Sequence, residues 1–420
     1  MAQRSPSIGV VGGGLAGMAA SVALTRAGFD VQVFERAHAW GEVGAGINIS
    51  PNATRALEGM GLTEALAAVG NVMSGQLMRS LSTGEVVNEM ILAGDPADSG
   101  RFGAPYYIFH RADLIEVLAN AVPNIHLDHQ LVDLEEGDEG ATVIFANGRR
   151  ETFDVVIGAD GIRSRVRQVL YGDDTPTYLG QTAWRAFVDP KEIQDPEAIL
   201  GKYGFSGWAG RGNHLMTYFM RGKSLINLVG QNDSSAWTEE GWSIPASADA
   251  MREVFAEGIP DVQRLLAPMT SVSKWGLFGR KPTHNWGRGR VQLIGDAAHP
   301  MLPNAGQGAA QSFEDAYILG RWLAEEKDID TALASFREVR IPRAHAIQRQ
   351  SALNNARLHS GSLAPAGNGY PAPPAPKGGA LFGMGWIYDF NPTEQWSERV
   401  SYPLSNASDE IPGRQAPDSL

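Results

Sequence analysis

Residues 291–316 read VQLIGDAAHPMLPNAGQGAAQSFEDA, and the rest of the chain is organised around this stretch. Its apolar start, VQLI, predicts a buried strand that ends at Gly295-Asp296. A turn rich in proline, asparagine and glycine follows, and a helix is expected from Ala309 onward. A strand that ends in a carboxylate, beside a glycine-lined helix start, can hold a polyol and turn backbone N–H groups toward an electron-rich ring system.

A second glycine-bearing turn stands near the start of the chain. An apolar strand over Ile8–Val11 is followed by GGGLAG, in which Gly12, Gly14 and Gly17 have the spacing GxGxxG, and a helix is predicted after it. Gly12 permits a tight turn, Gly14 lets the backbone approach a pyrophosphate, and Gly17 lets helix and strand pack closely.

The next predicted strand, Val31–Phe34, ends at Glu35, where a carboxylate can accept hydrogen bonds from an adenosine ribose. GxGxxG alone is a weak signal. A strand before it, a helix after it and an acid at this distance favour dinucleotide binding over a merely glycine-rich turn. Because the two turns lie far apart in the sequence, the fold must bring them together around one long ligand.

Composition and charge exclude several functions. The chain has 420 residues, 43% of them hydrophobic and 20% charged, which fits a globular protein of two or three domains. A net charge of −12 without any basic run argues against nucleic-acid binding. The absence of cysteine rules out disulfides, thiolate metal sites and cysteine nucleophiles, and no metal site is expected. The segment MAQRSPS before the first strand is too short for a signal peptide and no apolar run reaches membrane-spanning length, so we expect a cytoplasmic protein without a membrane partner.

Three further segments leave alternatives open. Residues 41–52, GEVGAGINISPN, are either backbone pressed close to a ligand or a flexible loop. Arg111, at a strand-to-helix junction, either forms a local salt bridge or reaches a cofactor. Asp160-Gly161 follows a predicted strand and precedes three arginines at helical spacing, which either close over a phosphate or form a solvated helix face.

Between about residues 177 and 285 the pattern changes to short, aromatic segments separated by glycine, asparagine or aspartate. This pattern is typical of a mostly antiparallel sheet that forms a second domain and walls a pocket. Within it, His214 and Tyr218 fall on one face of a strand. From the residues alone, such a pair is more often part of a satisfied core than of a catalytic site.

Taken together, GxGxxG with Glu35-Arg36, the segment GADG at 158–161 and GDAAHP at 295–300 resemble the single-component FAD-dependent aromatic hydroxylases of the para-hydroxybenzoate hydroxylase fold. Within that group the chain is most similar to the salicylate, 3-hydroxybenzoate and 6-hydroxynicotinate hydroxylases, through GEVGAGINISPNA, PYYIFHRADL and the His-x-x-x-Tyr pair. The resemblance runs from about residue 7 to residue 350.

The resemblance implies an α/β fold in which a Rossmann-like FAD-binding domain is interleaved with a mainly antiparallel β-sheet substrate domain, followed by a helical C-terminal region. The expected FAD-binding domain comprises residues 1–72, 100–176 and 286–350, and the substrate-binding domain comprises 73–99 and 177–285. From the residues themselves, helices are expected over Asp315–Glu325 and Ile329–Gln350. Residues 351–402 are expected to form a helical or irregular segment, and 403–420 a disordered tail.

The cofactor residues follow from the same resemblance. FAD is expected to contact Gly12, Gly14, Leu15, Ala16, Gly17, Glu35, Arg36, Gly46, Arg111, Asp160, Gly161, Asp296, Pro303, Gly306, Gln307, Gly308 and Ala309. Asp296 would accept a hydrogen bond from the ribityl chain. The helix start at 306–309 would face N1 and the C2 carbonyl of the flavin, where the reduced ring is anionic and a positive helix end stabilises the charge.

The implied substrate site contains Asn48, Tyr106, His214, Tyr218, Pro303 and Asn304. His214 and Tyr218 are the expected catalytic residues, with His214 as the base that converts a phenol to the more reactive phenolate. At Pro303 and Asn304 the chain departs from relatives that carry Gln or His in this loop, which leaves the hydroxylation position open. His299, inside the cofactor motif, is interpreted as structural.

The resemblance thus implies a monooxygenase that consumes NADH or NADPH and dioxygen and hydroxylates a small phenolic acid through a flavin C4a-hydroperoxide. The alternatives are a hydroxy-N-heteroaromatic acid or a larger phenol as substrate, a flavin oxidase or dehydrogenase without oxygen insertion, and a catalytically silent nucleotide-binding protein. The resemblance also allows a homodimer.

Overall fold

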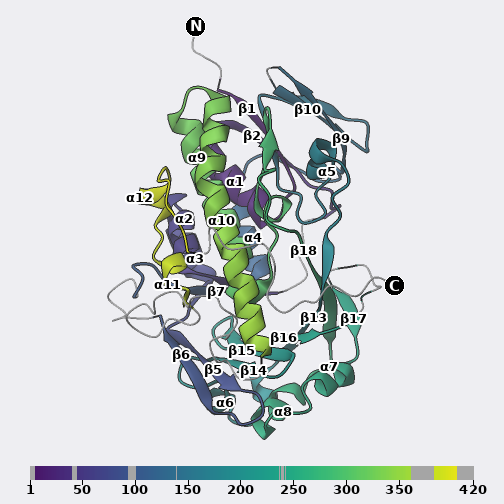
Figure 1. Cartoon of the computed structure of the whole chain (residues 1–420), viewed down its shortest axis with the longest axis vertical. Coiled ribbons are helices and arrows are strands. Elements are labelled where there is room, and N and C mark those ends of the chain that lie inside the picture. The colour runs from purple at the N-terminus through teal and green to yellow at the C-terminus, as the bar shows by residue number, and fades with distance from the viewer. Residues whose placement is uncertain are drawn as a thin grey trace.

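The computed structural model describes residues 5–39, 45–92, 101–138, 140–235, 237, 241, 243–360 and 383–403. Figure 1 shows a parallel sheet containing β1 and β2 at one end of the molecule and a second sheet containing β13–β16 at the other. The long helix α10 (Ile329–His359) runs from one end to the other. A site between the two sheets would therefore be lined by residues of both.

The first sheet has six strands and is parallel except at one edge. In spatial order its strands are β19 (Gly287–Arg288), β20 (Val291–Leu293), β12 (Val155–Gly158), β1 (Ser7–Val11), β2 (Asp30–Phe34) and β8 (Ile125–His126). Only the β19–β20 pairing is antiparallel. Because parallel strands end at the same edge, the turns after β1, β12 and β20 meet there, as the carboxyl-end rule for open α/β sheets requires.

Helix α1 (Leu15–Arg26) is apolar on nearly all sides because it is covered from two directions. It packs on the six-stranded sheet and on α9 (Gly308–Glu325), and it also contacts α4 (Arg111–Ala119). A Cβ on Gly320 of α9 would lie 3.1 Å from that of Ala23, so the two helices approach closely. Packing of α1 against α9 brings the two glycine-bearing turns together.

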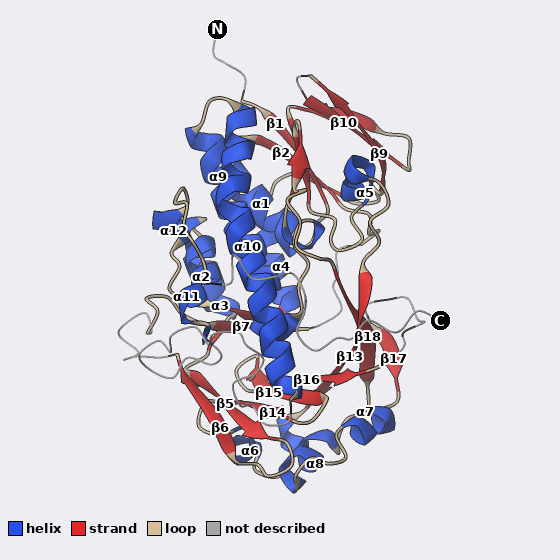
Figure 2. Ribbon diagram, in the orientation of Figure 1, coloured by secondary structure: helices blue, strands red, loops and turns tan. Residues whose placement is uncertain are grey.

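The second sheet has eight strands, antiparallel except for the β14–β5 pair. Its order is β17 (Ile244–Ala246), β18 (Val272–Gly279), β13 (Thr177–Val188), β16 (Leu225–Asp233), β15 (Asn213–Met220), β14 (Phe205–Ala209), β5 (Gly75–Ser80) and β6 (Val86–Ile91). Helices α6 (Pro196–Leu200), α7 (Ala248–Val254) and α8 (Pro260–Leu266) cover one face (Figure 2). Leu215 and Phe219 of β15 pack toward these helices, so the alternate residues His214, Met216 and Tyr218 face the other way, toward α10.

Smaller elements complete the fold. They are the sheet β3 (Gly46–Ile49), β7 (Tyr107–His110) and β4 (Asn71–Val72); the sheet β11 (Arg150–Phe153), β10 (Gly140–Phe145) and β9 (Leu131–Gly137); helices α2 (Pro51–Gly59), α3 (Thr63–Val69), α5 (Arg165–Tyr171), α11 (Gly385–Tyr388) and α12 (Pro392–Gln395); and the 3₁₀ turns η1 (Pro190–Glu192), η2 (Gly295–Ala297) and η3 (Pro303–Ala305).

The predicted mixed α/β fold is confirmed, with one boundary wrong. A helix over residues 329–350 was expected, yet α10 continues to His359. Residues 351–359 contain neither proline nor glycine, and Ser351, Asn354 and Leu358 are buried, so tertiary packing continues the helix past the predicted end. Pairing of β5 and β6 with strands from 177–279 supports the proposed interleaving of the domains. The tail predicted for 403–420 lies outside the described residues from 404 onward.

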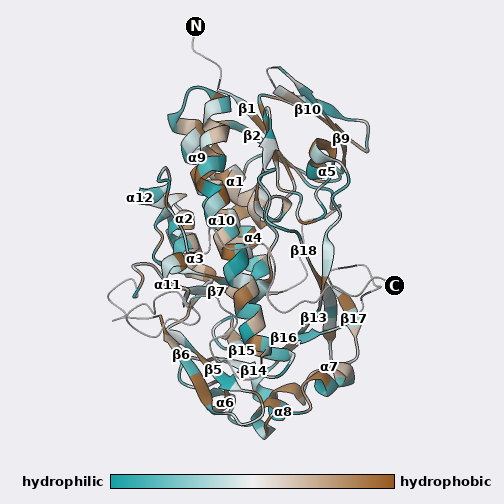
Figure 3. Ribbon diagram, viewed as in Figure 1, coloured by the Kyte–Doolittle hydropathy of each residue, from teal (hydrophilic) through white to brown (hydrophobic). Residues whose placement is uncertain are grey.

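Hydropathy follows this arrangement. Figure 3 shows hydrophilic and hydrophobic bands alternating along α10, which touches both ends of the molecule. In the described ranges, no helix combines the length and the hydrophobicity that crossing a membrane requires.

The glycine at position 17 generates a stability prediction. A Cβ there would lie 1.9 Å from the Gly12 carbonyl oxygen, a backbone atom that cannot move without distorting the first turn. We expect Gly17→Ala to lower the free energy of unfolding by about 3 kcal/mol, as measured by urea unfolding. Gly14→Ala is the control, because no atom lies within 4 Å of a Cβ built there. Equal stability of the two variants would contradict the prediction.

Candidate active site

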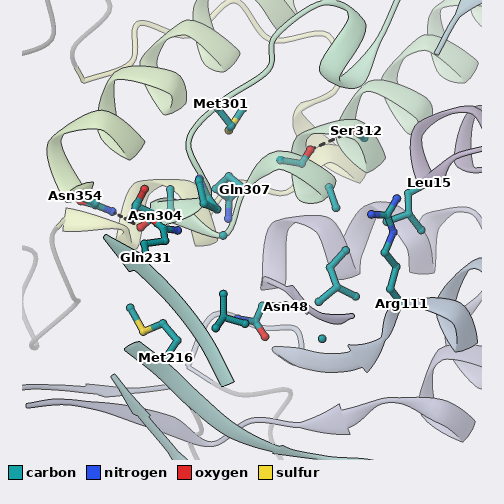
Figure 4. Close-up of a pocket in the computed structure, with 18 of the residues that line it drawn as sticks. Leu15, Asn48, Arg111, Met216, Gln231, Met301, Asn304, Gln307, Ser312 and Asn354 are labelled. Carbon is teal, nitrogen blue, oxygen red and sulfur yellow. Dashed lines mark hydrogen bonds between the residues drawn. The ribbon is translucent and has the colours of Figure 1, made fainter. Parts of the chain in front are cut away.

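A cavity of about 460 Å³ lies where the carboxyl edge of the six-stranded sheet faces the eight-stranded sheet. Figure 4 shows Leu15 and Arg111 at one end, and Met216, Gln231 and Asn304 at the other. Most of the residues predicted from the sequence lie on its wall: Gly14, Leu15, Ala16, Gly46, Asn48, Tyr106, Arg111, Gly161, His214, Tyr218, Asp296, Pro303, Asn304, Gly306, Gln307, Gly308 and Ala309. Of the stretch 41–52, residues 41–44 lie outside the described residues.

Four predicted cofactor residues outside the wall lie near the first turn. Gly12 has φ +108°, and a Cβ on it would lie 2.4 Å from the Ala159 carbonyl oxygen, so this glycine and Gly17 shape the turn. The Glu35 carboxylate accepts hydrogen bonds from the backbone N–H of Gly13 (2.7 Å) and of Ala37 (3.0 Å). Arg36 is exposed. Direct contact of these four residues with a cofactor stays a prediction.

Asp160, the fifth predicted cofactor residue outside the cavity wall, caps the start of α5. Its carboxylate accepts hydrogen bonds from the Ser164 hydroxyl (2.5 Å) and from the backbone N–H groups of Arg165 (2.6 Å) and Val166 (3.1 Å) at the start of α5. Burial raises the pKa of Asp160, and these hydrogen bonds oppose the shift. The carboxylate therefore fixes the turn that places Gly161 on the wall.

Two helices direct their amino ends at the cavity. Helices α1 and α9 begin after Gly14 and Gln307, and neither has a side-chain cap. The first N–H groups of each helix thus lack an intrahelical acceptor, and the helix dipole makes both ends electropositive. A Cβ on Gly14 or on Gly308 would meet no atom within 4 Å. These open backbone surfaces fit a diphosphate and an anionic ring edge.

Asp296 lies on the wall between these helix ends. Burial raises the pKa of its carboxyl group, while His299 and Arg111 oppose the shift. The described residues donate no hydrogen bond to this carboxylate, so its acceptor capacity is available to a ligand. A polyol hydroxyl fits this position.

A buried ion cluster lies directly behind the wall. The Asp315 carboxylate accepts hydrogen bonds from the Gly295 N–H (2.9 Å), His299 Nε2 (2.6 Å) and Arg340 Nε (2.8 Å). Burial alone would raise the pKa of Asp315, but His299 and Arg340 lower it to about 2. His299 is fully buried and bonded to Asp315, which agrees with the structural role predicted for it.

The neighbouring carboxylate extends this cluster. Glu314 accepts hydrogen bonds from Arg340 (2.7 Å), Arg343 Nε (2.7 Å) and Asn52 Nδ2 (2.6 Å). Asn52 also donates to the side chain of Gln307 at the start of α9 (3.1 Å). Sequence analysis missed the cluster, although two adjacent acids in an apolar helix, with two arginines three residues apart farther on, are a detectable signal.

His214 lies at the opposite end of the cavity, on the face of β15 away from α6–α8. It is 2% exposed, and its Nδ1 lies 2.8 Å from Nε2 of His359. Burial lowers the pKa of His214 well below 6.5, and His359 adds to the shift while Asp233 opposes it. The imidazole is therefore neutral near pH 7 and has the protonation state of a general base.

Tyr218 shares this strand face with His214. Burial raises its pKa to about 12, opposed by Arg185, so the hydroxyl stays protonated and can donate a hydrogen bond. Its ring stacks on Phe205 with centroids 5.0 Å apart. A Cβ on Gly46 would lie 2.4 Å from the Tyr218 oxygen, which explains the glycine at that position.

Several wall residues were not predicted. Arg185 was not predicted from the sequence. Its neighbours Trp184 and Ala186 face the side of the eight-stranded sheet that α6–α8 cover, so a charged residue between them indicates the opposite face, which lines the cavity. Tyr388 of α11 packs edge-on against Tyr106, with ring centroids 5.9 Å apart. The remaining additions include Gln76, Gln231, Trp275, Asn354, Leu358 and Met384.

Comparison with known proteins identifies the family. Residues 6–351 match the family model described as an FAD binding domain. The chain belongs to this family. It is 36% identical over 357 residues to 6-hydroxynicotinate 3-monooxygenase of Pseudomonas fluorescens, covering 83% of this chain and 91% of that protein. It is 35% identical over 347 residues to 3-hydroxybenzoate 6-hydroxylase of Klebsiella oxytoca, covering 80% and 85%.

A solved structure extends the similarity. The salicylate hydroxylase substrate complex superposes with a TM-score of 0.77 at 26% identity, over 95% of this chain and 99% of that one. The resemblance inferred from the motifs is confirmed, and the protein is an FAD-dependent aromatic-ring monooxygenase. Its cavity fits FAD, since two uncapped helix ends and the acceptor Asp296 match a diphosphate, an anionic ring edge and a polyol.

Asp296 generates a prediction about FAD. We expect Asp296→Ala to weaken FAD binding about tenfold, the loss of one hydrogen bond to a charged acceptor. Quenching of FAD fluorescence during titration of the apoprotein measures the dissociation constant. Asp249→Ala is the control, because that carboxylate is 89% exposed and lies on α7. An unchanged dissociation constant for Asp296→Ala would remove this residue from the cofactor site.

Asp315 generates a prediction about pH. Its pKa is about 2 in the folded protein and about 3.9 in an unfolded chain. The carboxylate therefore contributes about 3 kcal/mol of stability above about pH 5, which is lost progressively as the pH falls from about 5 through the folded pKa of about 2. In urea unfolding, we expect the stability difference between wild type and Asp315→Asn to shrink steadily from pH 5 to pH 2.5. A difference that does not change with pH would show that Asp315 titrates normally.

Proposed function

We propose that this monooxygenase hydroxylates a small aromatic acid with a ring hydroxyl, of the 3-hydroxybenzoate or 6-hydroxynicotinate kind, using NADH or NADPH and dioxygen. The names of the similar proteins specify such substrates for those proteins. NADH and NADPH stay alternatives. The homodimer and the cytoplasmic location stay predictions from the sequence.

One observation carries the proposal: a neutral buried histidine, a protonated tyrosine and an arginine meet at the cavity end remote from Asp296. His214, Tyr218 and Arg185 all line the wall there. A ring hydroxyl beside His214 would lose its proton to the imidazole, because a neutral histidine accepts hydrogen bonds and protons. The resulting phenolate donates electron density to the ring and makes it a better nucleophile.

Arg185 would bind the carboxylate of the substrate. Its guanidinium lies over Trp275, 4.6 Å from the ring centroid, which fixes the plane of the cation. A guanidinium presents paired donors that match a carboxylate. Binding of the carboxylate would orient the ring so that the ring hydroxyl reaches His214. Tyr218 would donate a hydrogen bond to the oxygen of that hydroxyl.

FAD, when bound, supplies the activated oxygen atom that is transferred to the ring. We propose that it contacts the cavity-lining residues among those predicted from the sequence, with its polyol on Asp296 and its ring near the start of α9. The apolar residues around the substrate end, among them Met216, Met301 and Met384, would exclude water.

A substrate panel tests the function. We expect the FAD-loaded protein to oxidise NADH or NADPH faster with 3-hydroxybenzoate, 6-hydroxynicotinate or salicylate, and to form hydroxylated product in step with that oxidation. Chromatography of products, with hydrogen peroxide and carbon dioxide measured alongside, gives the result. Peroxide equal to the nucleotide consumed with every compound would instead indicate a flavin oxidase. Carbon dioxide release would mark salicylate-type chemistry.

Arg185→Met refines the same test. We expect its KM for the accepted acid to rise about 10–100-fold, the loss of a charged hydrogen-bonded pair. The variant should barely change activity with the corresponding phenol, which lacks the carboxylate. Arg264→Met is the control, because Arg264 lies on α8 and pairs with Asp261 outside the cavity. An equal loss for acid and phenol would contradict a carboxylate-binding role.

A further inference from the structure

A row of hydrogen-bonded groups leads from the substrate end of the cavity toward solvent. His214 Nδ1 lies 2.8 Å from His359 Nε2, and His359 Nδ1 lies 2.7 Å from an Asp233 carboxylate oxygen. His214 is 2% exposed, the His359 side chain 6% and the Asp233 side chain 60%. The row therefore begins at the cavity wall and ends at the surface.

Three separate elements build this row. His214 lies at the start of β15, Asp233 at the end of β16, and His359 at the last turn of α10. The backbone N–H of Gly212 donates to the His359 carbonyl (3.0 Å), and the backbone N–H of Asp233 donates to the Gly212 carbonyl (2.8 Å). The end of the helix is thus fixed to the β14–β15 turn.

The Asp233 carboxylate determines which atom donates and which accepts in every hydrogen bond of the row. A carboxylate can only accept, so His359 must carry a hydrogen on Nδ1. In a neutral His359, Nε2 is then an acceptor, and His214 must donate to it from Nδ1. The second nitrogen of His214, Nε2, is left with its lone pair, and no described residue bonds to it. His214 is consequently set as a base.

The position of His214 also makes a charged imidazole unstable there. Burial favours the neutral ring, so a proton taken from a substrate should not remain on His214. His359 is the next acceptor, and Asp233 beside it stabilises a positive charge. The groups that act electrostatically on His214 are His359 from α10 and Asp233 from β16, while Arg185 and Tyr218 share its face of the cavity.

We propose that His359 and Asp233 form a relay that orients His214 and carries the substrate's hydroxyl proton to solvent. The proton leaves the substrate oxygen for His214 Nε2, and the hydrogen on His214 Nδ1 passes to His359 Nε2. His359, then positively charged, passes the hydrogen on its Nδ1 through the exposed Asp233 carboxylate to water. Charge and protons balance, with a phenolate in the cavity and one proton in solvent. Both imidazoles return to their first tautomers when the product oxygen takes a proton back along the same row.

Gln181 completes the surroundings of the relay. Its side-chain Nε2 donates to the Asp233 carboxylate (3.0 Å) and also lies 3.2 Å from His359 Nδ1. Both nitrogens are then donors, and the shorter contact of 2.7 Å between His359 Nδ1 and the carboxylate places the hydrogen on Nδ1. The hydrogen bond from the Gln181 amide, a group that does not titrate, holds the Asp233 carboxylate in front of His359. His359 and Asp233 act through His214, so both are positioning residues.

Ring ¹⁵N NMR of histidine-labelled protein tests the direction of the hydrogen bonds in the row, without substrate or turnover. We expect His214 to carry its hydrogen on Nδ1 and His359 on Nδ1, with signals assigned from His214→Gln and His359→Gln. In Asp233→Asn, we expect His359 to change tautomer, because an amide can donate to Nδ1. A wild-type His359 with its hydrogen on Nε2 would overturn the proposal.

Measurement of proton release tests the proton transfer along the relay. This part of the proposal rests on the proposed function. FAD-loaded protein is mixed with 3-hydroxybenzoate or 6-hydroxynicotinate in weak buffer with phenol red, and the absorbance is followed by stopped flow. We expect His359→Gln to slow release about 100-fold, with the dissociation constant of the acid changed less than about threefold, because glutamine can keep the hydrogen bond to His214 without relaying a proton.

His345→Gln is the matched control, since it makes the same substitution on α10 at a residue that bonds the Thr283 carbonyl outside the cavity. Release at the wild-type rate in both His359→Gln and Asp233→Asn would overturn the relay while leaving the function intact. Should His359→Gln fail to fold, Asp233→Asn alone decides. Wild-type protein that binds both acids without releasing a proton would instead count against the proposed function.

Discussion

The carboxylates of Glu314 and Asp315 meet the guanidinium groups of Arg340 and Arg343 where no water reaches them. Removing one partner from such a cluster leaves a buried charge uncompensated, which costs about 3–5 kcal/mol. The cluster therefore holds α9 and α10 in one relative position. Through the Gly295 N–H and Asn52 it also fixes the turn after β20 and the start of α9, which together form the cofactor end of the cavity.

The two ends of the cavity differ in electrostatics, and the difference matches the division of chemistry between them. The cofactor end is made of backbone: two uncapped helix starts and open glycine surfaces that suit negative charge. The substrate end is made of side chains from one face of the eight-stranded sheet, where burial keeps His214 neutral and Tyr218 protonated. Each end is supplied by a different sheet, so the cavity exists only when both are assembled.

Helix α10 connects these ends physically. Its first half carries Arg340 and Arg343, which hold the cofactor turns, and its last residue is His359, which contacts His214. The helix reaches His359 only because it extends past the end predicted from its sequence. Any shift of α10 would therefore disturb both the ion cluster and the proposed relay, so this helix would couple the proposed flavin position to the proposed proton transfer.

Short-range sequence determined what depends on local backbone and periodicity: the glycine turn at 12–17, the strand β20 that leads into the turn at Asp296, and the shared strand face of His214 and Tyr218. Each follows from spacings of a few residues, whereas most of the other wall residues were predicted only through the family resemblance. Only the tertiary structure decided what depends on contacts between distant elements. It assigned Glu35 and Asp160 to backbone hydrogen bonds, turned Arg185 into the cavity, brought Tyr388 from α11, and placed His359 beside His214. Such pairings depend on how helices and sheets pack, and no local spacing encodes them.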